Sequence, residues 1–136
     1  MTYLAERLAD LRRYLDHATR LREKVSGPDA LAHDLSLHND VVYTLLMISQ
    51  LVIDICGELS TRAGLRFADY TEAVANLRTL GGFPEDVMEV LVRLTGFRNV
   101  IVHEYVALDH TRVVNALHET GPIEVFARLV AERAAG

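Results

Sequence analysis

The sequence predicts an all-α protein, an antiparallel bundle of four to five helices, and three observations support this prediction. Apolar residues recur at intervals of three and four over long segments, as they do in a helix with one buried face. No segment alternates apolar and polar residues as a half-buried strand does. Only three prolines interrupt the 136 residues, half of which are hydrophobic. This length suits one core, so we expect a single helical domain over residues 1–136.

The first half of the chain is expected to form two long helices. The first runs from about residue 2 to residue 24, and its narrow apolar stripe consists of Leu4, Leu8, Leu11, Leu15, Ala18 and Leu21. Ser26-Gly27-Pro28 ends this helix, because glycine and proline both interrupt the helical backbone. The second helix runs from about residue 29 to residue 60. Its later half is apolar on most sides, so it should occupy the middle of the bundle.

Three further helices are expected in the second half. A short helix should end at Gly81-Gly82, because glycine readily takes the backbone conformation that closes a helix. Pro84 suits the first turn of the next helix. Asp109 is a suitable cap for the last helix, which Gly121-Pro122 should kink or divide into two pieces.

Composition narrows the function. The net charge of −5 argues against a large basic surface for nucleic acid and against anionic membranes, but it allows a small phosphate site. Residues 41–56 are too short for a membrane span and contain Gln50 and Asp54, so they indicate a core helix. The single cysteine, Cys56, lies in this apolar run and is expected to be a buried, inert thiol. The first residues lack a signal-peptide pattern, so we expect a cytoplasmic protein.

The most informative segment is Gly96-Phe97-Arg98-Asn99-Val100-Ile101-Val102-His103-Glu104-Tyr105. Spacings of four and three define an apolar seam along the helix that leads into it: Val87, Leu91, Leu94 and Ile101. Arg98 takes the missing position on this seam, and Tyr105 takes the next one. A charged side chain on an apolar seam costs free energy unless it has a partner or a purpose.

A regular helix does not bring the polar residues of this segment together. His103 follows Arg98 by five residues, which places it about 140° away around the helix axis. Two arrangements remove the difficulty. The helix ends or distorts within residues 100–102, whose β-branched side chains are mediocre helix formers, or a second copy completes the site. We favour a composite site in a homodimer.

The residue types suit metal-free RNA cleavage. That reaction needs a base for the 2′-hydroxyl, an acid for the leaving oxygen and a cation for the phosphate. A histidine such as His103 titrates near neutral pH and serves as base or acid. Arg98 can hold a phosphate through two parallel hydrogen bonds, Asn99 offers a neutral donor, and the Tyr105 hydroxyl can orient the phosphate.

Structural explanations of the same residues remain open. Arg98 could form an ion pair with Asp54 or Glu58, His103 could be favoured by the dipole of a helix end, and Tyr105 could be a core aromatic. A metal site is not expected, because only Asp34 and His38 of the acidic and histidine residues have useful helical spacing. We expect no cofactor.

The decapeptide also resembles the signature of the HEPN family (higher eukaryotes and prokaryotes nucleotide-binding). It is most similar to the small HEPN toxins that are paired with minimal nucleotidyltransferase (MNT) antitoxins. Asn39-Asp40-Val41-Val42-Tyr43 opens a long helix, Tyr70-Thr71-Glu72-Ala73 begins a short one, and Asp109 opens the last helix, as in that family. The resemblance covers about residues 3–120.

What the resemblance implies is specific. Such proteins are homodimeric bundles that cleave RNA without metal at an arginine–x4–histidine motif. By position, Arg98 and His103 are then the catalytic pair, and Asn99 supports them. Tyr105 matches the tyrosine that the MNT partner modifies with AMP, a change that adds negative charge beside Arg98.

The resemblance therefore predicts the endoribonuclease toxin of a type II/VII-like toxin–antitoxin pair. Its expected partners are an RNA substrate and a cognate MNT antitoxin, with which the homodimer could form a higher hetero-oligomer. Cleavage is expected to leave a 2′,3′-cyclic phosphate on the RNA. One alternative is a non-catalytic HEPN-like bundle that only binds the nucleotidyltransferase. Another is an oligomerisation module in which Arg98 fixes the register of packing.

Overall fold

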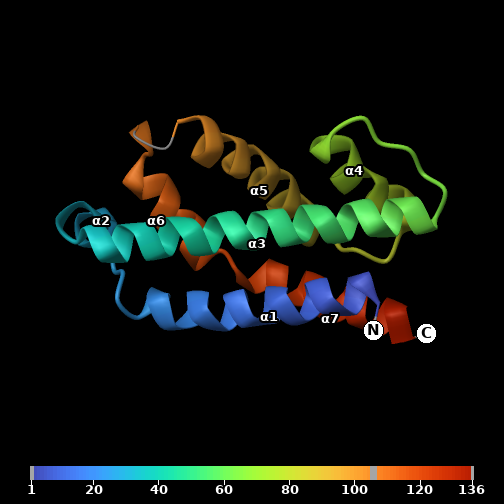
Figure 1. Cartoon of the computed structure of the whole chain (residues 1–136), viewed down its shortest axis with the longest axis horizontal. Helices are drawn as coiled ribbons and strands as arrows, with labels where there is room; N and C mark the ends of the chain where they lie inside the picture. Colours follow the sequence, from blue (N-terminus) through green and yellow to red (C-terminus); the bar gives the residue numbers. More distant parts are fainter. Residues whose placement is uncertain (1, 105–106, 136) are drawn as a thin grey trace.

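A computed structural model describes residues 2–104 and 107–135, and these residues form helices and connecting segments without a strand. Figure 1 shows the helices in chain order. Their bounds are α1 Tyr3–Arg22, α2 Pro28–His33, α3 Leu35–Arg62, α4 Tyr70–Leu80, α5 Glu85–His103, α6 His110–His118 and α7 Gly121–Ala135. The predicted all-α fold class is confirmed.

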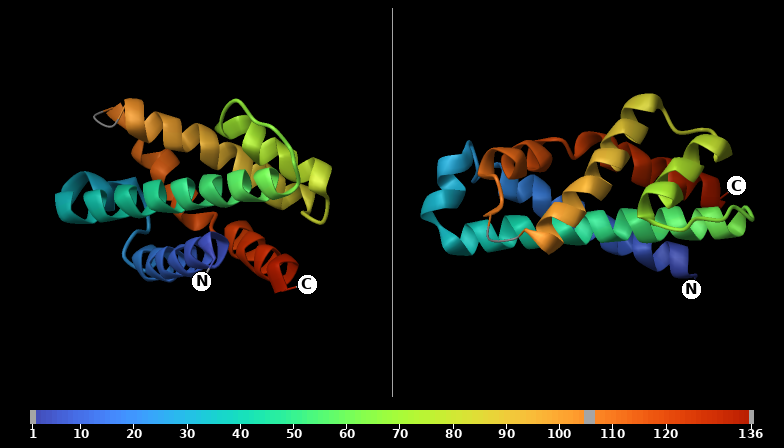
Figure 2. Two further views of the ribbon diagram at one scale, coloured as in Figure 1. Left: turned by 45° about the vertical axis from the view of Figure 1, so that its right-hand side comes forward. Right: turned by 90° about the horizontal axis from the view of Figure 1, so that it is seen from above.

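The bundle is built around α3. Helix α1 packs along one side of α3, and the pair α4 and α5 packs along the other side. Helix α7 contacts both α1 and α5. Figure 1 shows α3 between these two groups, with the labelled N and C ends close together at one end of the bundle. Figure 2 shows α5 crossing α3 at an angle in the view from above. Neighbouring long helices run in opposite directions, as expected for a bundle with short connections.

The expected helix over residues 29–60 is wrong in one respect, because the chain breaks at Asp34. That residue has extended backbone angles (φ −137°, ψ 99°), and its side chain accepts a hydrogen bond from the backbone N–H of Leu37. Asp34 therefore caps a new helix instead of continuing the old one. The break separates α2 from α3, and the predicted division at Gly121 separates α6 from α7. The described residues accordingly form seven helices where four to five were expected.

The core confirms the predicted apolar stripes. All six stripe residues of α1 are buried, and α3 is buried on most sides. By length and composition α3 could cross a membrane, but 61% of its most apolar window is buried against other helices. Cys56 is fully buried there, and burial raises the pKa of its thiol, as expected for an inert cysteine.

Two side chains tie the C-terminal helices to distant turns. His118, at the end of α6, lies with Nε2 3.0 Å from the carbonyl oxygen of Val25, which follows α1. Arg133 of α7 donates to the carbonyl oxygen of Gly81 at 3.2 Å. Gly81 ends α4 with φ +77°, a conformation that side-chain-bearing residues rarely adopt. These contacts fix α6 and α7 against the rest of the bundle, beside α5.

Candidate active site

Helix α5 carries the candidate catalytic residues. It begins after Pro84, and acidic residues in its first turn complement the positive end of the helix dipole. The predicted seam is buried: Val87, Leu91, Leu94 and Ile101 are between 0% and 6% exposed. The helix stays α-helical through His103 and is capped only at Glu104, whose N–H bonds to the carbonyl oxygen of Val100. The alternative in which the helix distorts within residues 100–102 is therefore excluded.

Because α5 is regular, one subunit does not bring Arg98 and His103 to the same side. The two residues are about 140° apart around the axis and about 7.5 Å apart along it. Arg98 points to Tyr70 of α4 and is half-buried, whereas His103 lies exposed at the end of the helix. Asn99 is also exposed, on the same side of α5 as His103.

Arg98 has unusual surroundings for a charged residue on a seam. Its guanidinium carbon lies 4.9 Å from the centre of the Tyr70 ring, close enough for a cation–π interaction. Its Nη1 donates to the side-chain oxygen of Asn99 at 3.3 Å. Its Nε is buried and has no hydrogen-bond partner in the described part of the chain. A buried, unpaired donor costs free energy, so an added acceptor at this Nε would be favourable.

The carboxylates that could have neutralised Arg98 are engaged elsewhere. Asp54 lies 3.5 Å from Nε of Arg7 and accepts a hydrogen bond from Gln50 at 2.9 Å. Glu58 accepts from Arg62 at 2.8 Å on the surface of the same helix. The interpretation of Arg98 as one half of an ion pair with either carboxylate is therefore wrong. Asp54 forms the polar edge of α3.

Three residues of the described structure make contacts that sequence reasoning did not predict. Tyr70, the first residue of α4, supplies the ring under Arg98. His38 of α3 and His110 of α6 form a second feature, since their ring centres are 5.1 Å apart at an interplanar angle of 67°. Figure 1 shows that α5 ends and α6 begins at the same end of the bundle, beside the first turns of α3. Both contacts join separate helices, so no local sequence pattern signals them.

The remaining expectations concern Tyr105 and metal ions. Tyr105 lies outside the described residues, so its role stays a prediction. Among residues 2–104 and 107–135, the acidic, histidine and cysteine side chains form no group of three that could hold a metal ion. Asp34, one of the two residues with metal-ligand spacing, is used as a helix cap.

Comparison with known proteins indicates a ribonuclease family. Residues 5–130 match the protein family described as Ribonuclease HepT-like. Two proteins of Archaeoglobus fulgidus, both named as candidate RNases, are similar in sequence. One is 30% identical over 108 residues, or 79% of this chain and 81% of the relative. The other is 28% identical over 129 residues, or 92% of this chain and 98% of the relative.

The fold also matches a solved structure, that of a tri-AMPylated Shewanella oneidensis HEPN toxin in complex with an MNT antitoxin. The TM-score is 0.84, the alignment covers 97% of this chain and 99% of that chain, and the sequences are 19% identical. The resemblance to HEPN toxins inferred from the decapeptide is confirmed. With the family match spanning residues 5–130 of 136, the chain belongs to the HepT-like ribonuclease family.

Proposed function

We propose that this chain is a metal-independent endoribonuclease toxin that acts as a homodimer in the cytoplasm. The observation that carries the proposal is the state of Arg98: half-buried on an apolar seam, with an unpaired Nε and no carboxylate partner within the described residues. A purely structural arginine in this position would be expected to have such a partner. Membership in a ribonuclease family supports phosphate as the missing acceptor.

A second copy of α5 supplies what one subunit lacks. The regular helix separates Arg98 from His103, and two-fold symmetry can bring the arginine and histidine of two copies into one cleft. In the reaction, the 2′-oxygen of RNA attacks the adjacent phosphorus atom, and the bond from phosphorus to the 5′-oxygen breaks. One His103 accepts the 2′-hydroxyl proton, and the second His103 of the dimer donates a proton to the leaving 5′-oxygen.

Arg98 would stabilise the negative charge that develops on the phosphoryl oxygens, with Asn99 and Tyr105 positioning the phosphate. The products are a 2′,3′-cyclic phosphate and a 5′-hydroxyl end. Tyr70 would hold the Arg98 guanidinium in place through its ring.

The test is RNA cleavage in buffer that contains EDTA. Arg98→Ala and His103→Ala should each abolish cleavage and cellular toxicity while circular dichroism and the dimer mass remain unchanged. Arg128→Ala is the matched control, because this α7 arginine is exposed and pairs only loosely with Glu132 at 3.8 Å. Cleavage by the Arg98→Ala/His103→Ala double variant at the wild-type rate would refute the assignment.

We further propose that an MNT antitoxin silences the toxin by attaching AMP to Tyr105. The solved HEPN toxin of the same fold is AMPylated and bound to an MNT antitoxin, which supports this partner. Tyr105 follows Arg98 by only seven residues, so the negative phosphate of an attached AMP would compete with the RNA phosphate for Arg98. Co-expression with a cognate nucleotidyltransferase should raise the mass by one or more AMP groups, and Tyr105→Phe should remove an increment. The non-catalytic alternative would be favoured if the partner binds without adding AMP to the protein and the unmodified protein does not cleave RNA.

A further inference from the structure

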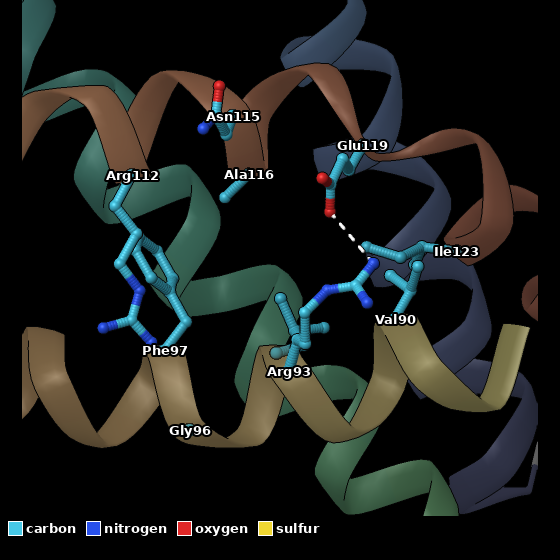
Figure 3. Close-up of a pocket in the computed structure, with 10 residues that line it drawn as sticks. Val90, Arg93, Gly96, Phe97, Arg112, Asn115, Ala116, Glu119 and Ile123 are labelled. Atoms are coloured by element: carbon cyan, nitrogen blue, oxygen red, sulfur yellow. Dashed lines mark hydrogen bonds and ion pairs between the residues drawn. The ribbon is translucent and has the colours of Figure 1, made fainter. Parts of the chain in front are cut away.

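A pocket of about 340 Å³ lies between α5, α6 and α7, on a side of α5 that Arg98 does not face. Its size falls at the lower end of the range of small-molecule sites, about 300–1,000 Å³. Figure 3 shows its two walls, the middle of α5 (residues 90–97) and the length of α6. The apolar lining is formed by Val90, Leu94, Phe97, Ala116 and Ile123.

The polar groups of the pocket are arranged in two parts. At one end Arg93 donates to Glu119 at 3.3 Å, so these two charges neutralise each other. At the other end the guanidinium carbon of Arg112 lies 5.5 Å from the centre of the Phe97 ring. Arg112 forms no ion pair within residues 2–104 and 107–135, so one positive charge remains available at this end. Asn115 lines the pocket from α6 and adds an amide that can both donate and accept.

We propose that this pocket binds one unpaired nucleotide of an RNA strand, a proposal that rests on the ribonuclease function proposed above. The base would lie on the apolar lining, and Arg112 would hold the adjoining phosphate or stack on the base. The amide of Asn115 would contact the edge of the base. Glu119 uses one carboxylate oxygen for Arg93, and the other oxygen can accept from an exocyclic amino group. The pocket therefore favours adenine, cytosine and guanine over uracil.

The position of the pocket fits a role beside the cleavage site. Gly96 lines it, and His103 follows Gly96 by seven residues, which places both on the same side of α5 within about 20°. Their separation along the axis is about 10.5 Å, short enough for neighbouring nucleotides of one strand to reach both. A Cβ atom at Gly96 would meet nothing within 4 Å, so the absence of a side chain leaves this edge of the pocket open.

A nucleotide suits the site better than an apolar peptide side chain does. A peptide anchor would use the apolar lining alone and leave Arg112, Asn115 and the second oxygen of Glu119 without new partners. A nucleotide combines a flat apolar body, an edge with donors and acceptors, and an anionic group, which matches all three features.

Binding of single nucleoside 5′-monophosphates tests the pocket independently of cleavage. NMR titration should show AMP, CMP and GMP binding more tightly than UMP, with shifts confined to residues of α5, α6 and α7 around the pocket. Arg112→Ala should weaken binding about tenfold, as expected for loss of one stacking or phosphate contact. Ala116→Leu should abolish binding by filling the pocket, and Asn115→Ala covers the case in which the leucine disturbs folding. Arg128→Ala should bind as wild type does.

The double variant Arg98→Ala/His103→Ala should still bind mononucleotides, which separates this proposal from the ribonuclease proposal. With RNA oligonucleotides carrying an abasic site at each position in turn, one position next to the cut should slow wild-type cleavage about tenfold. The abasic site at that position should not slow cleavage by the Ala116→Leu variant any further. The proposal is overturned if no mononucleotide binds, or if Arg112→Ala and Asn115→Ala both bind mononucleotides as tightly as the wild type does. It is also overturned if the pocket binds an apolar peptide and no mononucleotide. Mononucleotide binding without any RNA cleavage would instead refute the ribonuclease.

Discussion

Replacing Arg98 with methionine separates a functional arginine from a structural one. Methionine has a similar length, fits an apolar seam and carries no charge. If Arg98 exists to meet a phosphate, its removal should abolish RNA cleavage and leave the folded state about as stable as before. If Arg98 instead stabilises the bundle, the same substitution should unfold it.

The structure fixes the size of the expected change. The variant loses the contact with Tyr70, worth about 0.5–1 kcal/mol, and a long hydrogen bond to Asn99, worth about 0.5–1.5 kcal/mol. It gains about 1–3 kcal/mol, because the substitution removes the Nε of Arg98, which is buried without a hydrogen-bond partner. These terms nearly cancel, so the free energy of unfolding should change by less than about 2 kcal/mol in either direction. Breaking a buried ion pair would instead cost about 3–5 kcal/mol.

Urea unfolding at two protein concentrations measures this change and reveals any coupling to dimer formation. Leu91→Ala on the same seam is the positive control, because loss of a buried leucine side chain should cost about 2–5 kcal/mol. A loss above about 3 kcal/mol for Arg98→Met, with m unchanged, would refute the reasoning and favour a structural arginine.

Three further predictions test the fold. Cys56→Ala should remove part of the loss of stability at high pH, because the buried thiol stays protonated in the folded state. The unfolded thiol ionises above about pH 8.5, so the wild type should lose about 1.4 kcal/mol more per pH unit than the variant in urea unfolding. Gly81→Ala should lower stability by about 1–2 kcal/mol because φ is positive there, whereas Gly27→Ala, at an N-cap in extended backbone, should cost less, about 0.5 kcal/mol. Asp34→Ala should cost about 1 kcal/mol through the lost cap, and Asp34→Ser should restore most of it; equal stability of both variants would argue against capping.

Much of the fold was predictable because the information is local. The stripe on α1, the seam on α5, the cap at Asp109 and the break at Gly121 each depend on residues within a turn or two of one another. The break at Asp34 was missed for a local reason as well. An aspartate inside a helix and an aspartate that caps a new helix look alike in the sequence. In the fold, the break lets α2 pack against both α3 and α6.

For the candidate site as well, local features were predictable from the sequence and contacts between helices were not. The sequence by itself determined that Arg98 sits on an apolar seam and that a regular helix carries His103 to another side, because helical periodicity is a property of consecutive residues. Only the tertiary structure decided that the helix is regular, that Asp54 and Glu58 are occupied by other arginines, and that Tyr70 lies under Arg98. The pocket between α5 and α6 was equally invisible in the sequence. Its walls come from separate helices, and no local pattern records which of their side chains meet once the chain has packed.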